Sequence, residues 1–119
     1  RVMDAAELET AQRLIRRVPV GEAVVNAVLK LVRDARPGAG GRADVVPHIA
    51  WGPGPRASQA LMLASRARAV LDGRLAPSVD DVVALAGPVL RHRMALNFAA
   101  RADGITIGQI IDRLVEPLR

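Results

Sequence analysis

The chain has no cysteine, a single lysine, and only 2% aromatic residues among its 119 positions. The absence of cysteine excludes disulfide bonds, thiol catalysis and cysteine-ligated metal clusters. With so few aromatic rings, the core must consist of Ala, Val, Leu and Ile, a composition that favours closely packed helices. No apolar run approaches the roughly 18–20 residues of a membrane span. We therefore expect residues 1–119 to form one soluble domain.

The charge is unbalanced towards basic residues, and sixteen of the seventeen basic side chains are arginine. A formal net charge of +5 and a pI of about 11.4 predict partners that carry phosphates or carboxylates. One interpretation is a basic helical module that binds nucleic acid. Against it, the arginines are spread over all the predicted helices, and no aromatic residues are interleaved for base stacking. His48 and His92 are too few for a metal site, so none is predicted.

Helix-start signals and a 3.6-residue apolar period predict five helices. They begin after Asp4, near Val20, at Pro55, after Ser78 and after Thr106. The first, second, third and fifth are expected to end at Pro19, Arg36-Pro37-Gly38, Gly73 and Pro117, and the fourth to extend through Arg91-His92-Arg93. Gly87-Pro88 is expected to kink or split the fourth. No period-two alternation extends beyond a few residues. The sequence therefore predicts an all-α fold, a small orthogonal helical bundle of about four to six helices.

No complete set of catalytic motifs is present, including the Gly-x-x-x-x-Gly-Lys-Ser/Thr phosphate loop. The segment that stands out is 51–57, Trp-Gly-Pro-Gly-Pro-Arg-Ala. Pro55 suits the first helical position, and Arg56 adds a guanidinium to a helix N-terminus that already favours anions. The segment can therefore face a phosphate, although an arginine in a first turn is often only solvated or paired with a carboxylate. We expect Trp51 to anchor this loop to the helices, and His92 to be partly buried.

Five short motifs follow one another in a fixed order along the chain. They are Gly-Pro-Gly-Pro-Arg-Ala at 52–57, Ala-Ser-Arg-Ala at 64–67, Leu-Asp-Gly-Arg at 71–74, Pro-Ser-Val-Asp-Asp-Val at 77–82 and Val-Leu-Arg-His-Arg at 89–93. Together they resemble the C-terminal lid domain of MoxR-type AAA+ ATPases, over roughly residues 20–100. In that family the first motif typically reads Gly-Ala-Ser-Pro-Arg-Ala, and later ones read Pro-x-Asp-Asp-Val and Val-Leu-x-His-Arg.

The resemblance implies specific roles for three residues. Arg56 takes the place of the sensor 2 arginine, which reaches the γ-phosphate of ATP bound to a separate nucleotide-binding domain, in the same subunit or a neighbouring one. Gly54 and Pro55 precede it in the same cofactor-binding loop. Gly54 departs from the family pattern, since it replaces the usual Ser and removes a hydroxyl that could cap the helix.

The family's other properties follow as expectations. The resemblance implies a chaperone-like, cytoplasmic, homo-oligomeric ring that uses ATP and Mg in the full-length protein and contacts its own AAA+ core. Its ATP cycle would remodel or mature partners, often proteins with von Willebrand factor A domains. The 119-residue chain alone is not expected to be catalytic. A competing interpretation is a helical protein adaptor, in which Arg56 contacts only protein.

Overall fold

Six α-helices and two very short strands make up residues 2–38 and 40–119, the parts of the chain that this computed structural model describes. The helices are α1 (Ala5–Arg17), α2 (Glu22–Asp34), α3 (Pro55–Leu71), α4 (Val79–Leu90), α5 (Phe98–Ala102) and α6 (Ile107–Val115). Two 3₁₀ turns, η1 (Val46–His48) and η2 (Glu116–Leu118), complete the helical segments. The prediction of a small helical bundle is confirmed.

The helix ends lie close to the predicted positions because local polar contacts define them. Asp4 accepts a hydrogen bond from the Glu7 N–H at 2.8 Å, while the Glu7 carboxylate accepts one from the Asp4 N–H at 2.8 Å. Thr106 and Gln109 form the same reciprocal pair at the start of α6. After α3, Gly73 adopts φ +74°, a conformation that glycine takes without steric cost.

The structure differs from the sequence prediction in three places. α4 is not split at Gly87-Pro88 but continues to Leu90. Pro88 lies in its last turn, where a missing N–H removes only one bond of the ladder. β1 (Ile49–Trp51) pairs with β2 (Ala95–Leu96) as an antiparallel two-stranded sheet, and α5 spans five residues. Elements this short carry too little periodicity for a pattern to predict them.

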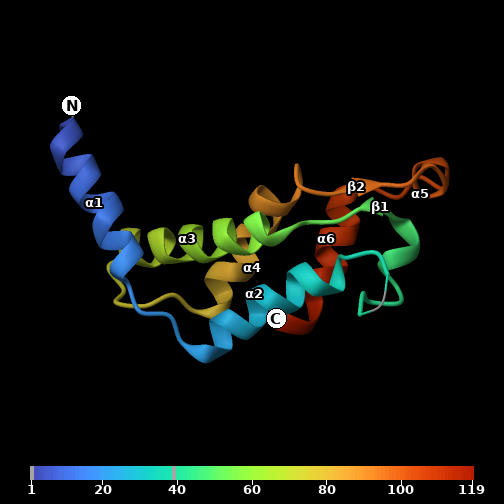
Figure 1. Cartoon of the computed structure of the whole chain (residues 1–119), viewed down its shortest axis with the longest axis horizontal. Coiled ribbons are helices and arrows are strands. Elements are labelled where there is room, and N and C mark those ends of the chain that lie inside the picture. The colour runs from blue at the N-terminus through green and yellow to red at the C-terminus, as the bar shows by residue number, and fades with distance from the viewer. Residues whose placement is uncertain (1, 39) are drawn as a thin grey trace.

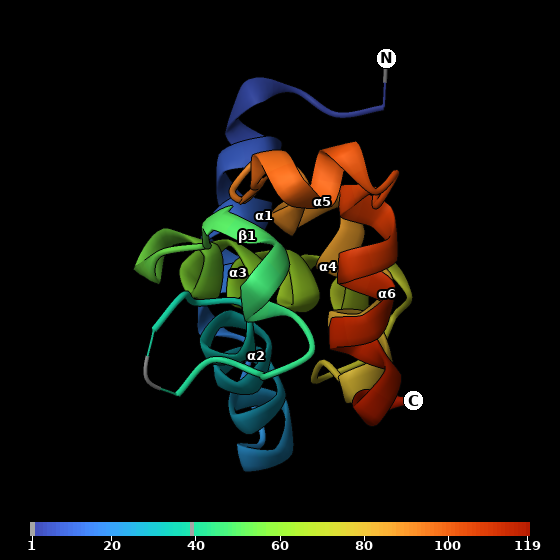
Figure 2. The same ribbon diagram turned by 90° about the vertical axis from the view of Figure 1, so that its right-hand side faces the viewer.

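α3 is the central helix and contacts α1, α2 and α4. α6 packs against α4 and α2, and Figure 2 shows it running beside α4. The core is aliphatic, as the composition predicts. Its fully buried large side chains include Leu31, Leu61, Leu90, Ile110 and Leu114. Trp51 and Phe98, the only two aromatic residues, are both exposed.

α1 extends away from the rest of the molecule (Figure 1). None of its residues is buried, and its contacts are made mainly with α3. The molecule measures 48 × 31 × 21 Å, and its radius of gyration is 15.8 Å. A compact chain of this length would have a radius of about 13.5 Å. Figure 1 shows α1 at one end of the long axis and β1, β2 and α5 at the other, which gives the molecule its elongated shape. Within the described residues, no helix has the length and apolar character needed to cross a membrane.

Candidate phosphate-facing site at the start of α3

Arg56 is the second residue of α3, and its side chain is exposed. Pro55 occupies the first helical turn, as predicted, and the Ala57 N–H donates to the Gly54 carbonyl at 3.0 Å. Gly54 is the N-cap residue and provides no side-chain cap. Among the described residues, the Arg56 guanidinium makes no hydrogen bond or ion pair. The start of α3 thus presents a positive charge to solvent beside a helix N-terminus, where an anion is favoured.

The loop that precedes Arg56 is held tightly against the end of α2. Pro53 is buried, and a Cβ added to Gly52 would lie 2.4 Å from the Ala35 carbonyl oxygen. Only glycine fits at that position without a shift of the backbone. Asn97, directly after β2, donates from its Nδ2 to the carbonyl of Pro47 in η1 at 2.6 Å, which also holds the turn that precedes β1. Arg56 is therefore presented from a well-supported loop.

Three further residues of α3 lie on the same face of the helix as Arg56. Ala60, Leu63 and Ala67 follow Arg56 at spacings of four, three and four residues, which places all four on one face. These three residues line a groove that also involves α1 and α4. The candidate phosphate contact and the groove thus share one face of α3.

Two expectations about nearby residues are wrong. The Trp51 side chain does not anchor the loop, since it is 55% exposed and the anchoring is done by Gly52 and Pro53. His92 is exposed, because α4 ends at Leu90 and the following turn is directed to solvent. Its Nε2 atom lies 2.6 Å from the Arg93 Nη1 atom, which also donates to the Val89 carbonyl. Neither residue is brought against Arg56 by a described contact.

Sequence reasoning missed a buried ion cluster at the other end of α3. Asp81 is fully buried and accepts hydrogen bonds from Arg74 at 2.6 and 2.7 Å and from Arg68 at 2.5 Å. It also accepts the Ser78 N–H at 2.8 Å, the capping contact that the Ser-x-x-Asp spacing predicts. The spacing revealed the cap, but nothing in the sequence pattern paired Arg68 and Arg74 with it. The cluster joins the end of α3 to the start of α4.

Charge pairing shifts the ionisation of two carboxyl groups. Hydrogen bonds from Arg74, then from the Ser78 backbone and Arg68, hold the pKa of Asp81 well below its usual range despite the opposing effect of burial. Arg42 binds Asp44 at 2.5 and 2.6 Å and lowers the pKa of that carboxyl to about 2. Neither carboxylate has a described contact with Arg56.

Comparison with known proteins decides the family. The family model described as "AAA lid domain" matches residues 41–114. The chain belongs to the AAA lid domain family. The lid is 32% identical over 116 residues to Chaperone MoxR1 of Mycobacterium tuberculosis, a match that covers 97% of the lid and 31% of that protein. The resemblance to lids of MoxR-type AAA+ ATPases is thereby confirmed.

A solved structure supports the same fold. The lid superimposes on the crystal structure of a protein assigned as an ATPase from Cytophaga hutchinsonii with a TM-score of 0.80 and 28% sequence identity. That match covers 92% of the lid and 32% of the other chain. The lid thus spans about a third of the length of both relatives.

Proposed function

We propose that this lid senses the nucleotide state of a MoxR-type AAA+ ATPase through Arg56. The exposed guanidinium, free of described partners at the start of α3, is the observation that supports the proposal best. It lies in the motif position that the family resemblance assigns to sensor 2. There it would bind the γ-phosphate, stabilise the charge that develops during transfer to water, and couple the orientation of the lid to the bound nucleotide.

The lid would supply only part of the nucleotide site. Its residues fit a phosphate contact, namely Arg56 with the Gly54-Pro55 turn before it, but they do not fit a magnesium site. Within the described residues, no three metal-ligating side chains gather. ATP and Mg would therefore be held by the core domain of the full-length protein, in the same subunit as Arg56 or a neighbouring one.

The wider activity follows from the same proposal. Copies of the full-length protein would assemble into a cytoplasmic ring, and ATP hydrolysis would move the lids and remodel partner proteins. Proteins with von Willebrand factor A domains are the partner class that the resemblance implies. The similarity to a chaperone supports remodelling as the output.

Replacement of Arg56 by Ala in the full-length protein tests the sensing role. We expect ATP turnover to fall at least tenfold, about 1.4 kcal/mol of lost transition-state stabilisation, with an unchanged thermal unfolding midpoint. Arg101→Ala, which removes an exposed arginine on α5, is the matched control and should leave turnover within about twofold. Equal turnover in the wild-type and Arg56→Ala proteins would instead favour the adaptor interpretation.

A further inference from the structure

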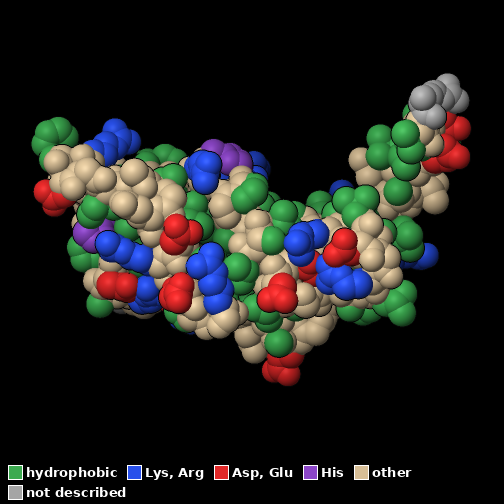
Figure 3. Space-filling model, turned by 180° about the vertical axis from the view of Figure 1, so that it is seen from behind, with side chains coloured by type: hydrophobic (Ala, Val, Ile, Leu, Met, Phe, Trp, Pro, Cys, Tyr) green, Lys and Arg blue, Asp and Glu red, His purple; other side chains and the backbone are tan. Residues whose placement is uncertain are grey.

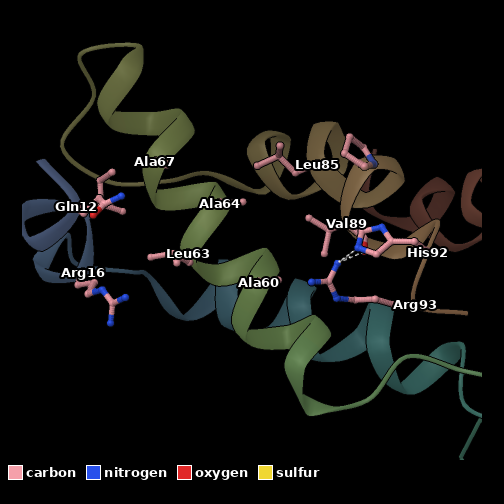
Figure 4. Close-up of a pocket in the computed structure, with 12 residues that line it drawn as sticks. Gln12, Arg16, Ala60, Leu63, Ala64, Ala67, Leu85, Val89, His92 and Arg93 are labelled. Atoms are coloured by element: carbon pink, nitrogen blue, oxygen red, sulfur yellow. Dashed lines mark hydrogen bonds between the residues drawn. The ribbon is translucent and has the colours of Figure 1, made fainter. Parts of the chain in front are cut away.

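Two adjoining hollows lie against α3. The groove between α1, α3 and α4 has a volume of about 690 Å³, and a second hollow of about 560 Å³ lies between α1 and α3. Both are lined by Arg16 of α1 and Leu63 of α3, so they form one continuous surface. Figure 4 shows Leu63 and Ala60 between Arg16 on one side and Arg93, beyond the end of α4, on the other. Leu63 is 40% exposed where the two hollows meet.

The walls of the groove are mainly aliphatic. Alanine, leucine, isoleucine, valine and proline side chains line it, together with Gln12, two arginines and His92. The lining residues of α3 run from Ala60 to Ala67, a length of about 10 Å or two helical turns. A groove of this length matches the apolar stripe of a short amphipathic helix, an element that peptide partners commonly lay into apolar grooves.

The permanently charged side chains around this surface are all arginines. Arg16 and Arg93 line the groove, Arg16 and Arg66 line the second hollow, and no acidic residue lines either one. Within the described part of the chain, none of the three has a carboxylate within ion-pair distance. The Arg93 Nη1 donates to the Val89 carbonyl at 2.8 Å, which orients this guanidinium, and the Arg66 Nε is buried without a described hydrogen-bond partner. Arginines without partners around an apolar groove are complementary to carboxylates that flank an apolar stripe.

We propose that an acidic amphipathic helix of a partner protein binds this surface. Its aliphatic side chains would cover Leu63 and the neighbouring wall of the groove, and carboxylates on either side of that stripe would pair with Arg16 and Arg93. Nucleic acid fits less well, because no aromatic residue lines either hollow for base stacking and a phosphate backbone has nothing to cover aliphatic walls. The proposal goes beyond nucleotide sensing, since Arg56 lines neither hollow.

Titration of the full-length protein with a designed peptide tests the chemistry of recognition. The probe is a fluorescein-labelled peptide of about 14 residues, roughly four helical turns, with Leu at every third or fourth position and Glu on both sides of that stripe. Fluorescence anisotropy should give a dissociation constant below about 100 μM. Matched peptides with Gln in place of every Glu, or Ala in place of every Leu, should each bind at least tenfold more weakly. Binding of either matched peptide as tight as that of the probe, or no saturation by the probe at about 1 mM, would overturn the proposal.

Variants of the full-length protein locate the site. Arg16→Glu and Leu63→Glu should each weaken binding of the probe at least tenfold, since both residues line the two hollows. The matched controls are Arg101→Glu, on α5, and Leu71→Glu, at an 88% exposed position outside both hollows, and each should change binding less than twofold. Circular dichroism verifies that every variant is folded. Equal losses in a site variant and its control would contradict the proposal.

Two further measurements separate this proposal from nucleotide sensing. Arg56→Ala should bind the probe as the wild type does even where it lowers ATP turnover, and Arg16→Glu should leave turnover within about twofold, because Arg56 and Arg16 line different sites. Loss of turnover in Arg16→Glu with unchanged probe binding would assign the surface to the ATPase itself and overturn the proposal. Displacement of the probe by an equal concentration of a single-stranded oligonucleotide would overturn it in favour of nucleic acid.

Discussion

At the scale of single residues, Asp81 joins the end of α3 to the start of α4. It is a fully buried carboxylate with hydrogen bonds from two arginines and from the backbone that begins α4. Burial of a charge is costly unless partners and hydrogen bonds compensate for it. Here the compensation comes from both sides of the turn between α3 and α4. Asp81 therefore fixes how the helix that carries Arg56 meets its neighbour.

The variant Asp81→Asn should destabilise the chain by about 2 kcal/mol, because it removes the charge that binds both guanidinium groups. The cost stays below that of a fully buried pair, since the Arg68 and Arg74 side chains are 43% and 35% exposed and can turn to water. Thermal denaturation should show a midpoint about 6–10 °C lower. Asp80→Asn, at the exposed neighbouring position, is the control and should change the midpoint little. A midpoint for Asp81→Asn equal to that of the control would show that the cluster contributes nothing.

The same carboxylate predicts how stability depends on pH. The pKa of Asp81 is depressed in the folded state, so its contribution is present above the unfolded pKa, about 3.9, and is lost as pH falls through the folded value. Asp44, with a pKa of about 2, adds to the same trend. Urea denaturation of the wild-type chain should therefore show a loss of stability from about pH 4 downwards. The Asp81→Asn variant should lose less free energy of unfolding over that pH interval than the wild type. Equal losses in the two proteins would refute the assignment of this pH dependence to Asp81.

At the scale of elements, the loop from β1 to α3 determines where Arg56 lies. Gly52 packs against the backbone of Ala35, whereas the position of Gly54 has no atom within 4 Å of an added Cβ. The two glycines of this three-residue loop thus have opposite tolerance for a side chain. The family usually has Ser at the position of Gly54, and the open space around Gly54 agrees with that pattern.

Matched serine substitutions test this difference. Gly52→Ser should destabilise the chain by roughly 2 kcal/mol, because its Cβ would overlap a carbonyl oxygen and force the backbone to move. Gly54→Ser should stabilise it by a few tenths of a kcal/mol, since a serine hydroxyl can accept a hydrogen bond from the first turn of α3. Chemical denaturation of both variants measures the two effects. A similar loss of stability in both would mean that the loop is not held as described.

The sequence was sufficient to predict the ends of those helices that have strong local signals. Asp4 with Glu7, Thr106 with Gln109, and Gly73 each define a helix end through contacts within a few residues. What it could not provide depends on distant parts of the chain. The pairing of Ile49 with Leu96, the exposure of Trp51 and the groove between α1 and α4 are set by tertiary packing. The role of Arg56 was predicted from a motif, and its solvent-facing position is consistent with that role.

At the scale of the whole molecule, the excess of arginine does not form a continuous basic face in the view of Figure 3. Acidic and basic side chains alternate over that surface. Several arginines also have carboxylate partners within the chain, among them Arg42, Arg68 and Arg74. A protein that binds duplex DNA through phosphate contacts needs its positive charges concentrated and free. The net charge of +5 therefore does not by itself favour a duplex-DNA site.

We expect the 119-residue chain to bind random-sequence duplex DNA no more tightly than about 10⁻⁵ M at physiological salt, in the ordinary range of non-specific binding. Fluorescence anisotropy at several salt concentrations measures both the affinity and the number of phosphate contacts. Tight binding with a steep dependence on salt would restore the nucleic-acid interpretation.

The chain alone should not hydrolyse ATP, because it contains no phosphate-binding loop of the Gly-x-x-x-x-Gly-Lys-Ser/Thr type. Phosphate release by the purified 119-residue chain should equal that of buffer, while the full-length protein turns over. Sustained hydrolysis by the chain, co-eluting with it through two chromatographic steps, would show that it carries catalytic groups of its own.

The exposure of Trp51 also gives this lid a built-in optical reporter. The chain has one indole, and it lies in solvent at the end of β1, four residues before the helix that carries Arg56. Its emission in the free lid should have the long wavelength and easy quenching of a hydrated ring. Any partner or domain that closes over this end of the molecule will shift the emission to shorter wavelength and shield it from iodide. The lid movements proposed above can therefore be followed in real time with the native sequence, without an added dye.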